Sequence, residues 1–249
     1  SVKDVHGRYA AFQSIAVQYK FLEKAMVNRY LEWIRKWIQT NFAELNVLKS
    51  RTKVLFSFDI DHPFYAHDLR WDKLLKRKLI AWKQGDELDR YETYDFIFSH
   101  LENISSIFFF LCPEKASDLD NYLIRDSDSY LNLISELKNK TKIGIHPSYY
   151  AAEDMNLLNN EIHWLSVAHG SPIKSSRYHY LRNDVERNYP KLIEKEILND
   201  FSMAYGDHAG FRSSTSLPYH YFDLHKNRST RLMIYTPCIM DSTFAYNYQ

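Results

Sequence analysis

The chain has 249 residues, 45% of them hydrophobic and 25% charged, which is enough to bury the core of one large domain or two small ones. Its 32 Lys and Arg against 31 Asp and Glu leave a formal net charge of +1, which argues against nucleic acid or an anionic membrane surface as partner. No apolar run approaches the roughly 20 residues that a membrane span requires. The N-terminus lacks a basic region followed by an apolar stretch, so we expect no signal peptide and a cytoplasmic location.

The first part of the chain has a helical pattern. Between Ala11 and Phe42, apolar side chains recur at helical spacing: Ile15, Tyr19, Leu22, Met26, Tyr30, Ile34 and Ile38. Charged residues occupy the other face, so the pattern predicts one long helix, or two in succession, packed on a domain. We treat residues 1–50 as an N-terminal helical segment and residues 51–249 as the main domain.

Downstream, short apolar runs alternate with helical patterns. We expect buried strands at residues 53–58, 104–111 and 142–145, further strand-like pieces near 175–179, 201 and 232–239, and helices at 71–84, 91–103, 126–138, 153–169 and 185–198. Strands that alternate with helices indicate βα units and a largely parallel sheet or barrel. The simplest interpretation is a single α/β domain with an N-terminal helical extension.

Reactive side chains gather where the predicted strands end. Asp59 and Asp61 follow the first strand, and His146 follows the third. Arg177 and His179 end a later strand-like piece. Functional groups collect at the carboxyl edge of the sheet in such folds, so we expect these side chains to form a site there.

The spacing of Asp59 and Asp61 admits two interpretations. Alternation along an extended chain points both carboxylates the same way, and a metal or an arginine would remove their repulsion. One carboxylate could then bind a metal while the other accepts a proton. Alternatively, both could cap the next helix or pair with Lys or Arg. Together with His146 and His179, one carboxylate would complete an arrangement typical of catalytic zinc or iron.

Four short motifs occur in an order that is typical of one enzyme family. They are Asp59–His62, Gly144–Tyr149, Ser176–Arg182 and Gly210–Thr215. In this order they resemble the polysaccharide deacetylases, which are the NodB-homology group or carbohydrate esterase family four. The second motif is similar to a bacterial branch that reads His-Pro-Ser-Tyr at this point. The resemblance extends from Lys53 to the C-terminus.

The resemblance implies a distorted (β/α) barrel of about seven strands over residues 51–249. It also implies hydrolysis of an N-acetyl or O-acetyl group on an acetylated amino-sugar glycan, either a polysaccharide or a cell-envelope precursor. The implied cofactor is a divalent metal, zinc before cobalt or nickel. Asp59 matches the general base, Asp61 and His146 match metal ligands, and Arg177 matches the arginine that orients the base.

The sequence departs from the family pattern in three places. Tyr150 stands where a second metal-binding histidine is expected, so we predict His179 as the third ligand, with a substrate-facing His179 as the alternative. No histidine follows Leu232, so the chain stops before the family's late acidic histidine, another histidine replaces it, or the protein is not a competent deacetylase. Asp59-x-Asp61 replaces adjacent aspartates, which leaves open which carboxylate holds the metal.

Further residues complete the predicted site. Asp200 and Asp207 are each a candidate acidic partner of the orienting arginine, and Arg212 is a candidate partner of the base or of a substrate carboxylate. Tyr149 and Tyr180 are candidate sugar platforms, and the backbone amide near Tyr180 could serve the oxyanion. Core packing or a surface role is the alternative for each.

Two other functions stay open at this stage. A non-catalytic glycan-binding relative would keep the groove and lose metal ligands, and a metal-dependent amidohydrolase would act on a small amide that is not a sugar. The sequence does not indicate an oligomeric state.

Overall fold

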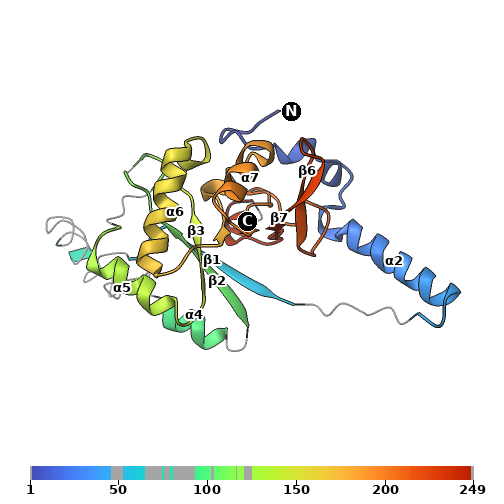
Figure 1. Cartoon of the computed structure of the whole chain (residues 1–249), viewed down its shortest axis with the longest axis horizontal. Helices are drawn as coiled ribbons and strands as arrows, with labels where there is room; N and C mark the ends of the chain where they lie inside the picture. Colours follow the sequence, from blue (N-terminus) through green and yellow to red (C-terminus); the bar gives the residue numbers. More distant parts are fainter. Residues whose placement is uncertain are drawn as a thin grey trace. The chain divides into compact units, whose positions relative to one another are not determined.

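The structure is a computed structural model in which residues 2–45, 53–64, 75, 79–80, 93–101, 104–115, 117–120 and 125–247 are described. The chain divides into two compact units, one made of residues 1–53 with 174–249 and the other of residues 54–173. Figure 1 shows the helices and strands of the whole chain, coloured along the sequence. Within the described ranges, no helix is both long enough and apolar enough to cross a membrane.

The unit of residues 54–173 is built on three parallel strands. They are β1 (Leu55–Ile60), β2 (Ser105–Leu111) and β3 (Lys142–His146). In the observed register Ile60 lies beside Phe110, and His146 lies beside Leu111. The carboxyl ends of β1 and β3 therefore flank the end of β2 at one edge.

Helices of the same unit lie beside these strands (Figure 1): α4 (Tyr94–His100), α5 (Asp128–Leu137), the 3-10 turn η3 (Tyr150–Ala152) and α6 (Met155–His169). Helix α6 begins where the Asp154 carboxylate accepts hydrogen bonds from the first free N–H groups. It ends at Gly170, whose φ of +82° closes the helix in the left-handed conformation.

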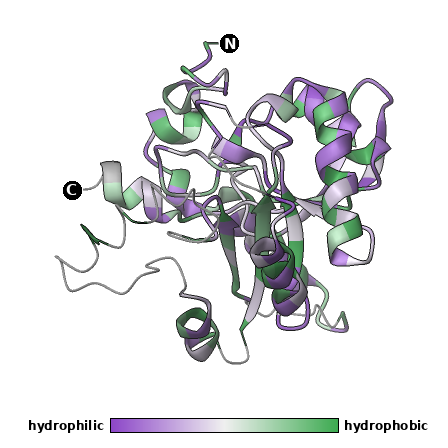
Figure 2. Ribbon diagram, turned by 90° about the vertical axis from the view of Figure 1, so that its left-hand side faces the viewer, coloured by the Kyte–Doolittle hydropathy of each residue, from purple (hydrophilic) through white to green (hydrophobic). Residues whose placement is uncertain are grey.

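Strand β2 supplies the centre of this unit's core. Residues from Ile107 to Leu111 are at most 1% exposed, and the central strands are largely hydrophobic in Figure 2. The Phe108 ring stacks on Phe58 at a centroid distance of 4.7 Å and on Phe98 at 5.6 Å. An uninterrupted apolar run of this kind is typical of a parallel strand that is covered on both faces.

The unit of residues 1–53 and 174–249 holds four strands. They are β4 (Ser175–Ser176), β5 (Asn199–Asp200), β6 (Tyr219–Asp223) and β7 (Arg228–Ile234). β4, β5 and β7 pair in parallel, whereas β6 is antiparallel to β7. The later helices are α7 (Val185–Glu194) and α8 (Asp241–Asn247).

The prediction of one or two long helices between Ala11 and Phe42 is confirmed for residues 26–41 and is wrong for the part before them. The segment forms four pieces: η1 (Ala11–Gln13), α1 (Ile15–Gln18), η2 (Leu22–Lys24) and α2 (Met26–Asn41). Lys20 and Ala25 adopt left-handed backbone angles, with φ of 55° and 42°, and such residues end a helical hydrogen-bond ladder.

The expected α/β architecture with mostly parallel strands is confirmed within the units, as are the strands near residues 53–58, 104–111 and 142–145. The expected strand at 175–179 is only two residues long, because the chain turns into the 3-10 turn η4 (His179–Leu181). The last predicted strand lies earlier, at β7, and the prediction missed β6 and α8. The predicted helix at 71–84 falls almost wholly outside the described residues.

We predict that Phe108→Ala lowers the free energy of unfolding by about 3–5 kcal/mol, because it removes a fully buried ring from the core. Phe96→Ala is the matched control, since Phe96 is 65% exposed on α4, and its effect should stay below about 1 kcal/mol. Urea unfolding measures both values. Equal losses in the two variants would contradict this description of the core.

Candidate metal centre

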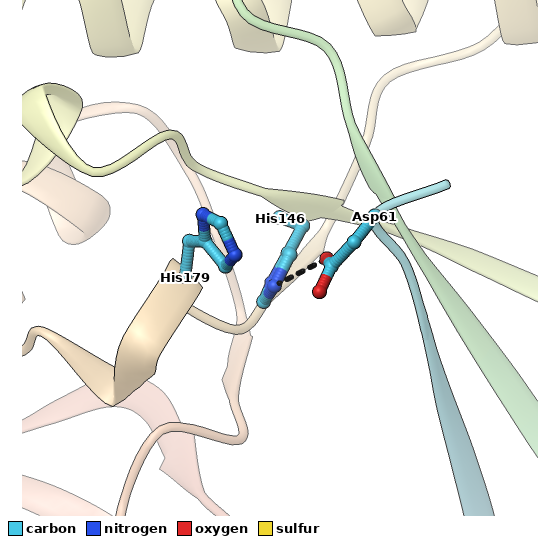
Figure 3. A group of neighbouring side chains, drawn as sticks. All are labelled: Asp61, His146 and His179. Atoms are coloured by element: carbon cyan, nitrogen blue, oxygen red, sulfur yellow. Dashed lines mark ion pairs between the residues drawn. The ribbon is translucent and has the colours of Figure 1, made fainter. Parts of the chain in front are cut away.

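A carboxylate and an imidazole meet at the carboxyl edge of the unit of residues 54–173. Asp61 directly follows β1, and His146 is the last residue of β3. The Asp61 Oδ1 atom lies 3.3 Å from His146 Nε2, and Figure 3 shows the carboxylate directed at the ring. The His146 side chain is 2% exposed and that of Asp61 is 36% exposed. The structure thus brings together two predicted metal ligands that are 85 positions apart in sequence (146 minus 61).

Two buried carboxylates hold the chain just after His146. The Glu161 carboxylate accepts hydrogen bonds from both the backbone N–H and the hydroxyl of Ser148. The Asp120 carboxylate accepts one from the backbone N–H of Tyr149 at 2.8 Å. Buried carboxylates are costly unless they receive such bonds. The backbone two and three residues after His146 is therefore fixed by two acidic groups.

Burial raises the pKa of Glu161 from 4.5 to about 7, against the lowering effect of its two hydrogen bonds from Ser148. The nearby Asp120 carboxylate also raises this pKa through charge repulsion. Because the folded protein disfavours the ionised form, Glu161 contributes most stability below its ordinary pKa. That contribution is lost as the pH rises through about 7.

Sequence reasoning missed Glu161 and Asp120. A signal for Glu161 was present, because in the pattern of α6 it stands among Leu158, Ile162 and Leu165, all of which are buried. A carboxylate on the apolar face of a helix is rarely fully buried without a partner. Asp120 lies in a loop and had no comparable signal.

The neighbouring tyrosines occupy different environments. Tyr149 is 7% exposed, whereas Tyr150 is 47% exposed, and their rings pack edge to face at a centroid distance of 5.3 Å. Asp59, the predicted base, lies within β1 opposite Phe109 of β2 and is half-buried.

Arg177 and His179 belong to the other unit, in the segment between β4 and α7. Both are buried, at 5% and 7% exposure. Arg177 Nε donates to the carbonyl oxygen of Phe201 at 3.3 Å. The His179 ring lies 4.5 Å from the Tyr180 ring, and Tyr180 is 38% exposed.

The buried Asp200 carboxylate organises the start of that segment. It accepts hydrogen bonds from the Ser176 hydroxyl at 2.9 Å and from both the backbone N–H and the hydroxyl of Ser202. The Ser202 hydroxyl in turn accepts the backbone N–H of Tyr178. Burial raises the pKa of Asp200, and the bonds from Ser202 and Ser176 oppose that rise. The chain that leads to His179 is thereby tied to β5.

Asp207 and Arg212 lie on the loop that follows β5. Asp207 is exposed and pairs with His208 at 3.1 Å. Arg212 donates to the carbonyl oxygen of Ala204 and lies 5.1 Å above the Tyr205 ring. Both residues line a small cavity of about 150 Å³.

Comparison with known proteins yields three findings. A family of unknown function (DUF7033) matches residues 1–43. None of the curated proteins matches the chain. A crystal structure from Mycobacterium smegmatis, provisionally described as a polysaccharide deacetylase, is similar at 15% sequence identity and a TM-score of 0.42 over 76% of this chain. The chain spans 60% of the length of that protein.

We predict that Glu161 makes the free energy of unfolding of the wild-type protein fall by up to about 3 kcal/mol between pH 4.5 and about pH 8. Folding raises the pKa of Glu161 from 4.5 to about 7, and each pKa unit is worth roughly 1.4 kcal/mol. Glu161→Gln should flatten this dependence, because the amide does not ionise. Glu136→Gln on the solvent side of α5 is the control and should keep the wild-type slope. Urea unfolding across this pH range provides the measurement, and identical slopes in wild type and Glu161→Gln would contradict the prediction.

Proposed function

We propose that this protein is a metal-dependent, deacetylase-like hydrolase that removes N-acetyl or O-acetyl groups from a polysaccharide or a cell-envelope glycan precursor. The observation that carries the proposal is the contact of Asp61 with buried His146 at the carboxyl ends of β1 and β3. Both residues lie in motifs that resemble the polysaccharide deacetylases. The acetylated amino-sugar glycan and the barrel of about seven strands belong to the same proposal.

The donor chemistry fits a divalent metal. Asp61 offers a carboxylate oxygen, and His146 and His179 offer buried imidazole nitrogens. Two imidazoles and one carboxylate with an open position suit zinc, and cobalt or nickel can take the same donors. His179 is the proposed third ligand, since exposed Tyr150 replaces the histidine that the family motif has there. A bound divalent metal would polarise the acetyl carbonyl and acidify the attacking water.

The remaining roles fall to side chains and backbone of this chain. Asp59, two residues before Asp61, is the proposed base that takes the proton of the attacking water. Buried Arg177 is the proposed orienting group, with Asp207 as a further acidic participant. A backbone N–H near Tyr180 would donate to the oxyanion.

Substrate contacts are assigned to the tyrosines and to Arg212. Tyr180 is exposed enough to stack on a sugar ring, whereas Tyr149 is largely buried and would contribute only an edge. Arg212 offers a guanidinium group to a substrate oxygen or carboxylate.

We predict that purified protein binds stoichiometric zinc and that His146→Ala reduces this content to background, because it removes a buried ligand. His163→Ala is the matched control, since His163 is an exposed histidine on α6. Elemental analysis after dialysis measures the metal. Wild-type protein that is metal-free and stays inert toward N-acetylated chito-oligosaccharides after zinc addition would refute the proposal. Retained oligosaccharide binding would then indicate a non-catalytic glycan-binding protein.

Asp59→Asn and Asp61→Asn should separate the base from the ligand. We expect Asp59→Asn to keep its zinc and to lose about 10²–10⁴-fold in deacetylation rate, as is usual for a missing general base. Asp61→Asn should lose both zinc and activity. Acetate release and zinc content are measured on the same preparations, and the reverse pattern would exchange the two assignments.

A further inference from the structure

We propose that residues 3–9, called here the N-terminal turn, hold the segment His179–Asp184 in its conformation, and that Arg8 is a positioning residue for His179. The inference concerns the unit of residues 1–53 and 174–249 only. It deepens the proposed function and rests on it, because positioning matters for metal binding only if His179 is a ligand.

The N-terminal turn is itself rigidly built around Asp4. The Asp4 N–H donates to the Arg8 carbonyl, and the Gly7 N–H donates to the Asp4 carbonyl, each at 2.9 Å. The Asp4 carboxylate accepts the backbone N–H groups of His6 and Arg8 and also Arg8 Nε at 2.6 Å. Gly7 has a φ of +74°, which a residue without Cβ adopts readily. The direction of the Arg8 guanidinium group is thereby fixed.

Residues His6 and Arg8 of this turn contact Tyr180 and Arg182 of the segment in three ways. Arg8 Nη1 donates to the carbonyl oxygen of Tyr180 at 2.6 Å. In the opposite direction, Arg182 Nε donates to the carbonyl oxygen of His6 at 3.0 Å. The His6 and Tyr180 rings pack at a centroid distance of 4.7 Å. The turn thus contacts the segment at Tyr180 and, two residues later, at Arg182.

The segment has a backbone that needs such support. Tyr180 and Leu181 are consecutive residues with left-handed φ values of 56° and 52°. For residues other than glycine this conformation is costly, and it persists where the surroundings fix it. Arg8 binds the carbonyl of one of these two residues directly. Release of that carbonyl would let the backbone relax and would reorient the neighbouring His179.

Arg8 is a better candidate for this role than Lys3, which also reaches the segment. Lys3 pairs with Asp184 at 3.0 Å, but its side chain is 50% exposed, against 18% for Arg8. Exposed ion pairs hold geometry weakly, because water and salt screen them. The guanidinium of Arg8 is more buried, and its own carboxylate partner orients it.

The test compares Arg8→Ala with Arg29→Ala. Arg29 is a matched control, because its side chain also donates to a backbone carbonyl, that of Lys24, away from residues 179–184. Amide hydrogen exchange in metal-free protein follows residues 179–184, and chelator competition measures the zinc dissociation constant. For Arg8→Ala we expect exchange in this segment to be at least about tenfold faster and zinc binding about tenfold weaker, the size of effect that outer-shell changes produce. Arg29→Ala should match wild type in both.

The outcomes separate this inference from the proposed function. Unchanged exchange at residues 179–184 in Arg8→Ala overturns the holding role. Faster exchange with wild-type zinc affinity overturns the positioning role. Absence of zinc binding in wild type overturns the proposed function and the positioning role with it, whereas the exchange data still decide the holding role. If Arg8→Ala fails to fold, Asp4→Asn loosens the same guanidinium and is judged by the same two measurements.

Discussion

Buried carboxylates that accept hydrogen bonds from the chain just beyond strand ends are the constraint on which the backbone around His146 in one unit, and around Arg177 in the other, depends. Glu161 and Asp120 receive the backbone N–H groups that follow His146. In the other unit, Asp200 receives Ser176 and Ser202, and Ser202 receives the N–H of the residue that follows Arg177. A buried carboxylate that loses such a bond pays its full desolvation cost. Each of these carboxylates therefore stabilises the one local backbone conformation in which its hydrogen bonds form.

The two units rely on this constraint to different degrees. β1, β2 and β3 have five to seven residues each, so their ladders already fix where the strands end, and the carboxylates fix the loop beyond His146. β4 and β5 have two residues each, so few ladder hydrogen bonds fix the segment that carries His179. Hydrogen bonds that the Asp200 carboxylate accepts, and the hydrogen bond that Arg8 donates to the Tyr180 carbonyl, take over that function. The backbone of the segment that carries His179 is therefore fixed by polar contacts rather than by sheet pairing.

The sequence predicted the parts of the fold that depend on apolar pattern. β2 and β3 were placed to within a residue because their runs are uninterrupted and buried. β1 ends two residues later than predicted, so Asp59 lies inside the strand and Asp61 follows it. The helical spacing between Ala11 and Phe42 led to the prediction of longer helices than the structure has. Short helices that restart after left-handed residues keep much of the same periodicity. A pattern of side chains does not report backbone angles at Lys20 and Ala25.

Side chains that hydrogen-bond to the backbone could not be predicted from the sequence for a related reason. Arg8 and Asp120 bind a carbonyl or an N–H, groups that every residue possesses. No spacing rule links them to the positions they hold, and only the folded chain brings them together. By contrast, Asp61 and His146 were identifiable because metal chemistry selects residue type.

The same network bears on whether the Asp61–His146 contact is only structural. Here burial, and to a smaller extent the Asp120 carboxylate, raises the pKa of Glu161 to about 7, so this group stabilises the fold less at neutral pH than in acid. Features that reduce stability are retained most readily where they hold a functional geometry. A backbone that is fixed in this way beyond His146 is what the metal-ligand role proposed for this histidine requires.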